Sequence, residues 1–577
     1  MPNFGFQPGS QELAKVRRES RSLFWFTAIF SGFVNILMLT GPLYMLQVYD
    51  RVLGSRSEAT LVALSVLVIF LYGMMGLLDF ARGRIMTRAG ARFQAALDHR
   101  VFDAMIRRSV VAKDPVAQTG LSDLESVQKL ISSPAVTASF DLPWTPVFLA
   151  GIALFHPWLG MLALGGGSFL IAITLLNQVF TKGPQQRSNT STQKAILLSE
   201  EIRNEAEMIQ AMGMRDAAFA RWKNARDAAL VDSVASADIG GGFTTLTKTL
   251  RMILQSAMLG LGAYLVLFNE LTPGAMIAGS ILMGRALSPI ELVLSNWPLV
   301  QRATKGWRSL AELLTKVPYE NNRTELPKPK AHLKVKGLTV VAPGTKVPLL
   351  RNVNFEVIPG QAIGVIGPSG SGKSTLSRAL TGVWSPVSGS IRLNGATLDQ
   401  FQSNVLGNYI GYLPQRVEVF EGSVAQNIAR LNQTPDPELV VAAAQKAAAH
   451  AMILKLPHGY DTTVDTAGGQ LSGGQMQRIG LARALFGDPV ITILDEPNSN
   501  LDNEGSNALN AAIKQIKSEG RAVLIMAHRP AAIQECDMLL MIDKGQQVAF
   551  GPRDEVLKAM VENHKQLRSA KSIGGVQ

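Results

Sequence analysis

The sequence predicts a helical membrane domain with six transmembrane segments, followed by an α/β domain built on a parallel sheet. Long apolar runs fill the chain up to about residue 310, whereas short strand and helix patterns alternate from about residue 331. In addition, the mean hydropathy is +0.15 and only 17% of the residues are charged. This combination is typical of membrane proteins.

Changes in composition along the chain indicate the domain boundaries. A polar, proline-bearing stretch, YENNRTELPKPKAHLK, separates the two halves and is typical of a linker. We expect a cytoplasmic tail (1–22), a six-helix transmembrane domain with long cytoplasmic helical extensions (23–310), a linker (311–331), an α/β domain (332–565) and a C-terminal tail (566–577).

The N-terminal residues and the cysteine content limit the processing that we expect. The first 20 residues lack the short apolar core and small-residue cleavage site of a signal peptide, so no cleaved leader is expected. Cys536 is the single cysteine, which excludes an intramolecular disulfide and predicts a small buried apolar side chain.

Six apolar segments are candidates for helices that cross about 30 Å of hydrocarbon. The first two carry no charge, and the third and fourth form a tight pair around His156-Pro157. The intervening polar segments show helical periodicity, so we expect them to extend the membrane helices into the cytoplasm. The six predicted spans are residues 23–47, 59–78, 142–155, 158–180, 243–268 and 273–294.

The positions of lysine and arginine predict the orientation. With six crossings, the basic residues that flank the spans all lie on one side, which the positive-inside rule assigns to the cytoplasm. The net charge of +12 is therefore attributed to cytoplasmic loops rather than to nucleic-acid binding. These residues are Lys15, Arg17, Arg18 and Arg21; Arg82, Arg84, Arg88 and Arg92; Lys182, Arg187 and Lys194; and Arg302, Lys305 and Arg308.

Two charged residues lie within the sixth predicted span. Charges inside a membrane are costly and usually face protein or water. Arg285 and Glu291 therefore have two interpretations: they line a polar translocation path, or they pair with each other or with a neighbour. A third interpretation for Glu291 is a position already outside the lipid.

The stretch VIGPSGSGKSTLSRAL, residues 365–380, contains a phosphate-binding loop. It fits G-x-x-x-x-G-K-[ST], and an apolar strand precedes it and a helical pattern follows it, as this motif requires. Backbone N–H groups and the helix N-terminus complement phosphate charge. We expect Lys373 to contact the β- and γ-phosphates and the Ser374 hydroxyl to ligate Mg²⁺. The expected nucleotide-binding residues here are Gly367, Pro368, Ser369, Gly370, Ser371, Gly372, Lys373, Ser374 and Thr375.

A second acidic motif, VITILDEP, supports the same chemistry. Residues 490–494 form an unalternated, β-branched run that is typical of a buried parallel strand. Asp495 follows it and suits the Mg²⁺ shell, while Glu496 suits a general base that activates water. This pair, well downstream of a phosphate loop, predicts nucleotide hydrolysis with Glu496, His528 and Lys373 as the catalytic residues, the role of His528 resting on a family resemblance.

That resemblance is carried by LSGGQMQRIGLARAL, residues 471–485. The C-terminal half resembles the nucleotide-binding domain of ATP-binding cassette (ABC) proteins, whose signature is LSGGQ. The resemblance implies that Gln415 in YLPQ senses Mg²⁺, and that His528 in LIMAHRP contacts the γ-phosphate. It also implies a D-loop with Asp502 and signature residues that act on the nucleotide of a second cassette, Ser472, Gly473, Gly474 and Gln475.

Two positions depart from the ABC pattern. The family usually stacks adenine on an aromatic residue, but VVAPGTK places Ala342 there, so base selectivity is expected to be weak. The segment before the signature, VDTAGGQ, lacks the acidic Glu-Gly pattern of exporters, which leaves the role of Asp465 in interdomain coupling open.

One cassette and six spans resemble half of an ABC exporter. The resemblance implies a homodimer with two ATP molecules between the cassettes, with a heterodimer of related halves as the alternative. Within the membrane half, GPLYMLQVYDRVLGSRSEATL, FDLPWTPVFL, HPWLG and AMGM resemble ATPases of type I secretion systems of the protease and RTX-protein export kind.

This second resemblance implies a Gram-negative inner-membrane exporter. It would pass an unfolded polypeptide, bearing an uncleaved C-terminal signal, to a periplasmic membrane fusion adaptor and an outer-membrane channel. Because only about 22 residues precede the first predicted span, we expect no peptidase-like domain of the kind found in the haemolysin and bacteriocin branches. Two alternatives remain: an exporter of lipids or small hydrophobic solutes, and a soluble cassette ATPase that acts on nucleic acid or ribosomes, which the spans disfavour.

Overall fold

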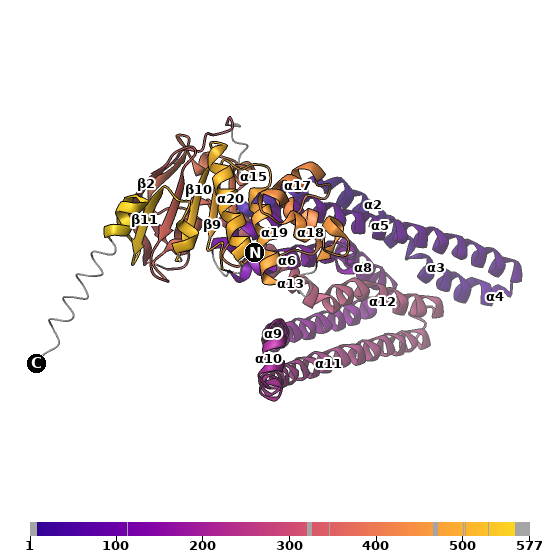
Figure 1. Ribbon diagram of the computed structural model, residues 1–577. Coiled ribbons are helices and arrows are strands. Elements are labelled where there is room, and N and C mark those ends of the chain that lie inside the picture. The colour runs from indigo at the N-terminus through magenta and orange to yellow at the C-terminus, as the bar shows by residue number, and fades with distance from the viewer. Residues whose placement is uncertain are drawn as a thin grey trace, which may run out of the picture. The chain divides into compact units, whose positions relative to one another are not determined.

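The chain forms two compact units that divide between Pro318 and Tyr319. The computed structural model describes residues 8–111, 114–319, 326–345, 347–464, 471–499, 501, 503–528 and 530–559. The first unit is helical, and the second contains helices and a large sheet (Figure 1). The predicted fold class is thereby confirmed in both halves.

The first unit consists of helices only, as far as the structure describes it. They are α1 (Pro8–Glu19), α2 (Arg21–Leu37), α3 (Thr40–Gln47), the π-helix η1 (Val48–Val52), α4 (Leu53–Ser55), α5 (Glu58–Val111), α6 (Pro115–Ile131), α7 (Pro134–Asp141), the 3₁₀ turn η2 (Leu142–Trp144), α8 (Thr145–Phe155), α9 (Pro157–Asn204), α10 (Ala206–Ala211), α11 (Arg215–Leu267), α12 (Pro273–Ser295) and α13 (Trp297–Lys316).

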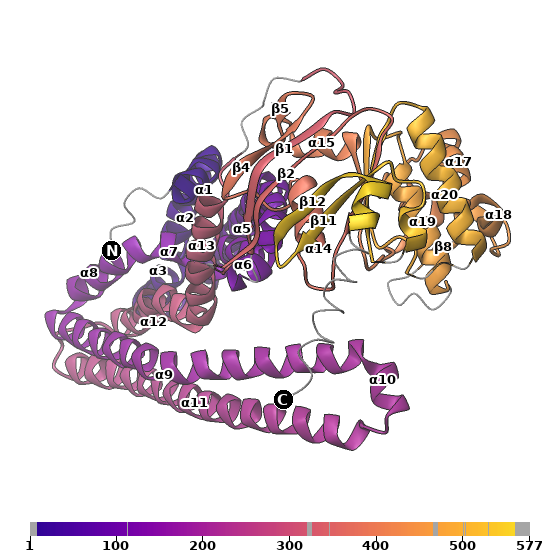
Figure 2. The same ribbon diagram turned by 60° about the vertical axis from the view of Figure 1, so that its left-hand side comes forward.

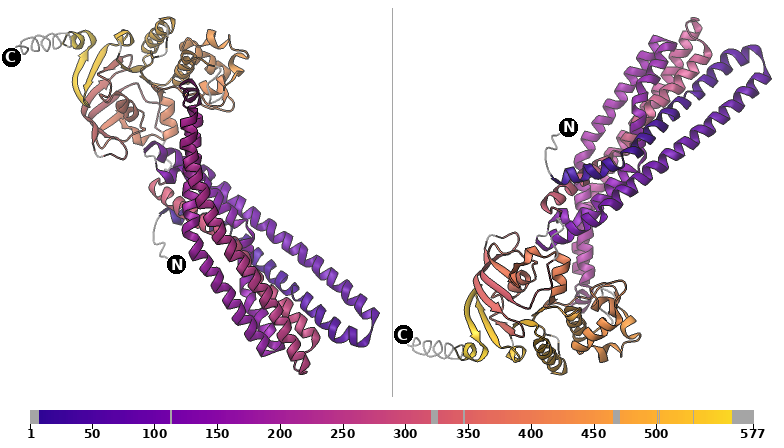
Figure 3. Two further views of the ribbon diagram at one scale, coloured as in Figure 1. Left: turned by 90° about the horizontal axis from the view of Figure 1, so that it is seen from below. Right: turned by 90° about the horizontal axis from the view of Figure 1, so that it is seen from above.

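Within the residues that the structure describes, six segments are long and apolar enough to cross a membrane, which agrees with the predicted number. Several of them extend beyond the predicted apolar ranges. Helix α5 has 54 residues and therefore measures about 80 Å. Helices α9 and α11 run side by side and are joined through α10 (Figures 2 and 3). Helical periodicity in the polar segments explains why the helices continue past the hydrocarbon-length core.

The linker prediction and the structure differ at one end. Helix α13 continues to Lys316, whereas the predicted linker starts at residue 311. The side chains of Leu313 and Leu314 are almost fully buried in a core with α1, α5 and α6, and this burial explains the longer helix. We therefore propose a linker that begins after Lys316.

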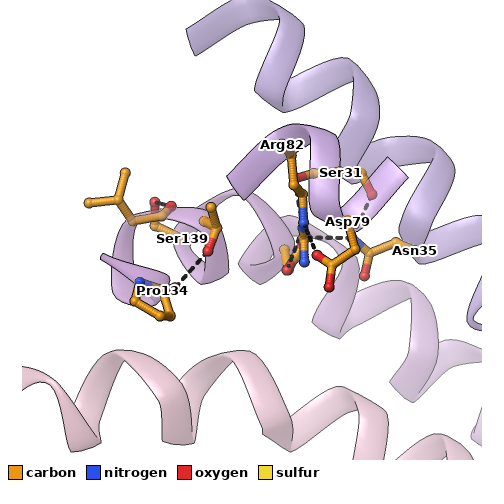
Figure 4. Close-up of polar contacts among 9 residues, drawn as sticks. Ser31, Asn35, Asp79, Arg82, Pro134 and Ser139 are labelled. Atoms are coloured by element: carbon orange, nitrogen blue, oxygen red, sulfur yellow. Dashed lines mark hydrogen bonds and ion pairs between the residues drawn. The ribbon is translucent and has the colours of Figure 1, made fainter. Parts of the chain in front are cut away.

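A buried polar cluster joins α2, α5 and α7. The guanidinium of Arg82 donates from Nη1 to Asp141 Oδ1 at 2.8 Å and to Ser31 Oγ at 3.0 Å, and Arg82 Nε pairs with Asp79 at 2.6 Å. Asn35 Nδ2 also donates to Asp141 at 2.6 Å. Figure 4 shows Arg82 directed toward Ser31, Asn35 and Asp79. Three helices are thus tied by one buried ion pair and its hydrogen bonds.

Polar contacts also join the three short connections between spans, which lie between α3 and α5, between α8 and α9, and between α11 and α12. Asp50 in η1 accepts hydrogen bonds from the Thr272 hydroxyl at 2.7 Å and from the Gly274 N–H at 2.9 Å. His156, which caps α9, lies 3.3 Å from Glu270. The connection between α11 and α12 therefore contacts the connection at η1 through Thr272 and the connection at His156 through Glu270.

The second unit is an α/β domain. Its strands are β1 (Leu333–Val341), β2 (Pro348–Val357), β3 (Ala362–Ile366), β4 (Ser388–Leu393), β5 (Ala396–Thr397), β6 (Ile410–Leu413), β7 (Gly422–Ser423), β8 (Thr463–Val464), β9 (Ile491–Asp495), β10 (Ala522–Ala527), β11 (Met538–Asp543) and β12 (Gln546–Pro552). Its helices are α14 (Lys373–Leu380), η3 (Leu398–Gln400), α15 (Ser403–Tyr409), α16 (Val424–Ile428), α17 (Pro437–Lys446), α18 (His450–Ile453), η4 (Gly459–Asp461), α19 (Gly473–Leu485), α20 (Asn503–Ser518) and η5 (Pro530–Ile533).

Ten strands form one mixed sheet in the order β5-β4-β1-β2-β12-β11-β3-β10-β9-β6. Neighbours from β11 through β3, β10 and β9 to β6 are parallel. Alternate residues of β10 enter different cores, with Val523 and Ile525 in one and Leu524 and Met526 in the other. Both faces of the central strands are therefore buried, which explains their unalternated apolar sequences.

Candidate nucleotide site

Four parallel strands bring the predicted site residues to one edge of the sheet. In register, Ile366 of β3 lies beside Ala527 of β10, and Met526 lies beside Asp495 of β9. Leu494 of β9 in turn lies beside Leu413 of β6. The residues that follow these strands share the carboxyl edge, where open α/β sheets bind ligands.

The phosphate loop connects β3 to α14 and depends on glycine at two positions. A Cβ on Gly367 would lie 2.0 Å from the carbonyl oxygen of Ile542. Gly372 has φ of +108°, a backbone conformation that side chains disfavour, and a Cβ there would meet Leu350 at 2.8 Å. The backbone can therefore curl closely around a small anion only because these residues lack side chains.

Polar groups inside the loop fit a phosphate. The ammonium of Lys373 donates to the carbonyl oxygens of Gly367 at 2.8 Å and Pro368 at 2.9 Å. The buried hydroxyl of Ser371 has no hydrogen-bond partner among the described residues. A phosphate oxygen is a stronger acceptor than a carbonyl and would satisfy both groups. The loop thus suits the triphosphate of ATP.

Asp495 is nearly fully buried at the end of β9. Burial raises its pKa, and hydrogen bonds from the hydroxyls of Ser374 and Ser377 oppose that rise. A cation would offset the cost of burying this carboxylate, and Ser374 and Asp495 are oxygen ligands of the kind that Mg²⁺ prefers. The structure therefore brings together two of the three residues predicted to bind Mg²⁺.

Glu496 is the centre of a group of three predicted residues. Its carboxylate accepts a hydrogen bond from Gln415 Nε2 at 3.1 Å, and His528 Nδ1 lies 3.3 Å from its other oxygen. The backbone of Glu496 has φ of +51°, and its N–H donates to the Met526 carbonyl at 2.9 Å. A base flanked by an amide and an imidazole is suited to orient and deprotonate water.

The signature residues form the start of α19. Ser472 caps this helix, and its hydroxyl accepts the Gln475 N–H at 3.3 Å while Gln475 Oε1 accepts the Ser472 N–H at 2.8 Å. Gly473 and Gly474 occupy its first two positions. This reciprocal cap satisfies two backbone N–H groups at the start of the helix.

Four further positions singled out in the sequence have different outcomes. Asp502 and Asp465 lie outside the described residues, so their expected roles stay predictions. Ala342 begins a turn in which its carbonyl accepts the Thr345 N–H at 3.0 Å. In the membrane half, Glu291 pairs with Arg251 of α11 at 2.7 Å and not with Arg285.

Sequence reasoning missed two polar residues next to the site. Ser377 lies in α14 one turn after Ser374, and its hydroxyl is 3.4 Å from Asp495. Gln477 follows the signature and donates to the Pro497 carbonyl at 3.1 Å. A polar residue on the inward face of each helix is the signal that could have indicated them.

Comparison with known families agrees with this geometry. Residues 350–499 match the ABC transporter family, and residues 23–289 match the ABC transporter transmembrane region. The fold resembles a bacterial Atm1-family ABC exporter structure with ATP bound, with a TM-score of 0.78, 21% identity, and coverage of 95% of this chain and 98% of that one.

Two similar proteins are exporters of the secretion type. The type I secretion system ATP-binding protein PrsD of Rhizobium meliloti (strain 1021) is 42% identical over 94% of both chains. The leukotoxin export ATP-binding protein LtxB of Aggregatibacter actinomycetemcomitans is 29% identical over 93% of this chain and 77% of its own length. The chain therefore belongs to the type I secretion ATP-binding proteins of the ABC transporter family, and is a multi-pass membrane exporter driven by ATP hydrolysis.

Proposed function

We propose that this exporter moves an unfolded polypeptide with an uncleaved C-terminal signal across the inner membrane of a Gram-negative bacterium. The observation that carries the proposal is the 42% identity to a type I secretion protein over 94% of the chain, because this similarity includes the membrane half. We infer that the conduit includes a periplasmic membrane fusion adaptor and an outer-membrane channel. Arg285 and Glu291 remain candidates for the translocation path through α12.

An exporter of lipids or small hydrophobic solutes is the alternative, since it shares six spans and a cassette. The similarity to a leukotoxin exporter favours a protein substrate. To separate the two, the C-terminal residues of a protein that depends on this exporter are deleted. We expect the truncated protein to stay in the cell, whereas deletion of its N-terminal residues leaves export intact. Export of the truncated protein at the full-length rate would contradict a C-terminal signal.

At the nucleotide site, the contacts around the phosphate loop and Glu496 support the following proposed roles. Lys373 binds the β- and γ-phosphates, and Glu496 takes a proton from water that Gln415 and His528 help to orient. Ser374, Gln415 and Asp495 would hold Mg²⁺, which neutralises phosphate charge when bound. The Mg²⁺ requirement is part of the proposal.

We further propose that two copies of this chain form a homodimer in which each signature completes the ATP site of the other. The chain has one phosphate loop, and its Ser472 and Gln475 bond each other rather than that loop in the described residues. Two ATP molecules would therefore lie between two cassettes.

A cysteine cross-link tests this arrangement directly. A chain with both Ser369→Cys and Ser472→Cys should give a doubled chain mass when a short bis-maleimide is added with ATP. Burial raises the pKa of the Cys536 thiol to about 12, so the native cysteine should not react. Each single cysteine variant serves as the control. Persistent single-chain mass in the double variant would contradict a signature that acts on the partner.

A further inference from the structure

Gln477 is a fully buried amide that links two functional segments of the second unit. It lies in the second turn of α19, where its side chain is 1% exposed. Its Nε2 donates to the Pro497 carbonyl oxygen at 3.1 Å. Pro497 follows Glu496 directly, and a proline can offer its neighbours only a carbonyl. The hydrogen bond therefore attaches α19 to the turn that bears the catalytic carboxylate.

That turn needs support because of its backbone conformation. Glu496 has a positive φ of +51°, which is uncommon for a residue other than glycine. Two backbone hydrogen bonds stabilise this conformation. The Glu496 N–H donates to the Met526 carbonyl, and the Glu496 carbonyl accepts the Ser499 N–H at 3.2 Å. The side chain of Gln477 in α19 adds a third hydrogen bond, to the carbonyl of Pro497, the residue after Glu496. Strained conformations persist only where the surrounding structure determines them fully.

The other end of α19 is the signature itself. Ser472 caps the helix at its first turn, and residues from Ile479 to Leu485 bury its following turns in the core of this unit. Because of this cap and this buried face, we expect α19 to move as one body. A shift of Ser472 is therefore transmitted to Gln477, and through Gln477 to the peptide after Glu496.

We propose that Gln477 is a positioning residue for ATP hydrolysis, which couples the signature to the catalytic turn of the same chain. This inference rests on the proposed homodimer. In it, the signature of one chain engages the nucleotide on its partner, while Glu496 acts on the nucleotide of its own chain. ATP bound at the partner's site therefore orders Glu496 of this chain, which acts on the ATP of its own site. Hydrolysis at the two sites is then cooperative.

ATP hydrolysis by the purified full-length protein tests the proposal. Gln477→Leu keeps the approximate shape and removes the donor, and we expect turnover at saturating ATP to fall by about 10- to 100-fold. ATP affinity should change by less than about twofold, because the phosphate loop is untouched. The cooperative dependence of the rate on ATP should also be lost. Gln445→Leu, at an exposed position of α17, is the matched control and should behave as wild type.

A second variant and a double-mutant cycle separate positioning from a general loss of structure. Gln477→Met keeps the approximate length of the side chain and cannot donate to Pro497, so it should show the same fall in turnover. In a Glu496→Gln background, Gln477→Leu should lower the residual turnover by less than about twofold, since both changes act through one carboxylate.

Three results would overturn the proposal: full turnover in Gln477→Leu, an equal fall in both backgrounds, or the same ATP cooperativity in wild type and Gln477→Leu. None of these results would affect the proposed export function, because export is measured separately, by deleting the C-terminal residues of a protein that depends on this exporter.

Discussion

Replacing Glu496 by glutamine should lower ATP turnover by about 10²-fold or more while leaving ATP binding intact. The amide keeps the size of the side chain and its contacts with Gln415 and His528, but it cannot accept a proton from water. Binding depends instead on the phosphate loop and Lys373, which this change does not touch. The variant should therefore accumulate with ATP bound and the cassettes closed.

The measurement is steady-state ATP hydrolysis together with equilibrium ATP binding, both on the purified full-length protein. Glu438→Gln provides a matched control, because Glu438 is an exposed carboxylate of α17 in the same unit. It should hydrolyse ATP at the wild-type rate. Wild-type turnover in Glu496→Gln would assign the role of base to a different group.

Replacing Arg82 by methionine should destabilise the membrane unit by about 3–5 kcal/mol. Arg82 and Asp141 are 7% and 6% exposed, and Asn35 and Ser31 beside them are fully buried. Without the guanidinium, the Asp141 carboxylate would remain buried, and the Asn35 amide would be its one remaining hydrogen-bond donor among the described residues. The large effect arises from this uncompensated charge rather than from the net strength of the pair.

Thermal unfolding in detergent measures this effect. Arg88→Met, at an exposed position of the same helix, is the matched control and should unfold near the wild-type temperature. The double variant Arg82→Met/Asp141→Leu should recover much of the loss, since it leaves no unpaired charge. If Arg82→Met unfolds at the wild-type temperature, the buried pair does not hold α2, α5 and α7 together.

Local motifs explain why so much of the nucleotide site could be predicted. Residues 367–375 are contiguous, and the apolar run before Asp495 identifies a buried parallel strand without knowledge of the sheet. The spacing of such motifs also matched a family, which supplied Gln415 and His528. The structure then brought Glu496, Gln415 and His528 within hydrogen-bond or ion-pair distance.

Pairs that depend on packing could not be predicted in the same way. Arg82 and Asp141 are separated by 59 positions, and Arg251 and Glu291 by 40. The sequence placed Arg82 among the basic residues of a cytoplasmic loop, because composition does not show which face of a helix is buried. Gln477 carries the signal of a polar residue on the inward face of a helix, but its partner is a backbone carbonyl, which the sequence does not identify.

The most direct test of the account is the protein content of the culture medium of the native host, compared between wild type and a chromosomal Glu496→Gln replacement. We expect one or a few proteins without N-terminal signal peptides to disappear from the medium, while the variant exporter remains in the membrane at the wild-type level. An unchanged set of secreted proteins, with the variant present in the membrane, would contradict polypeptide export and favour lipids or small solutes.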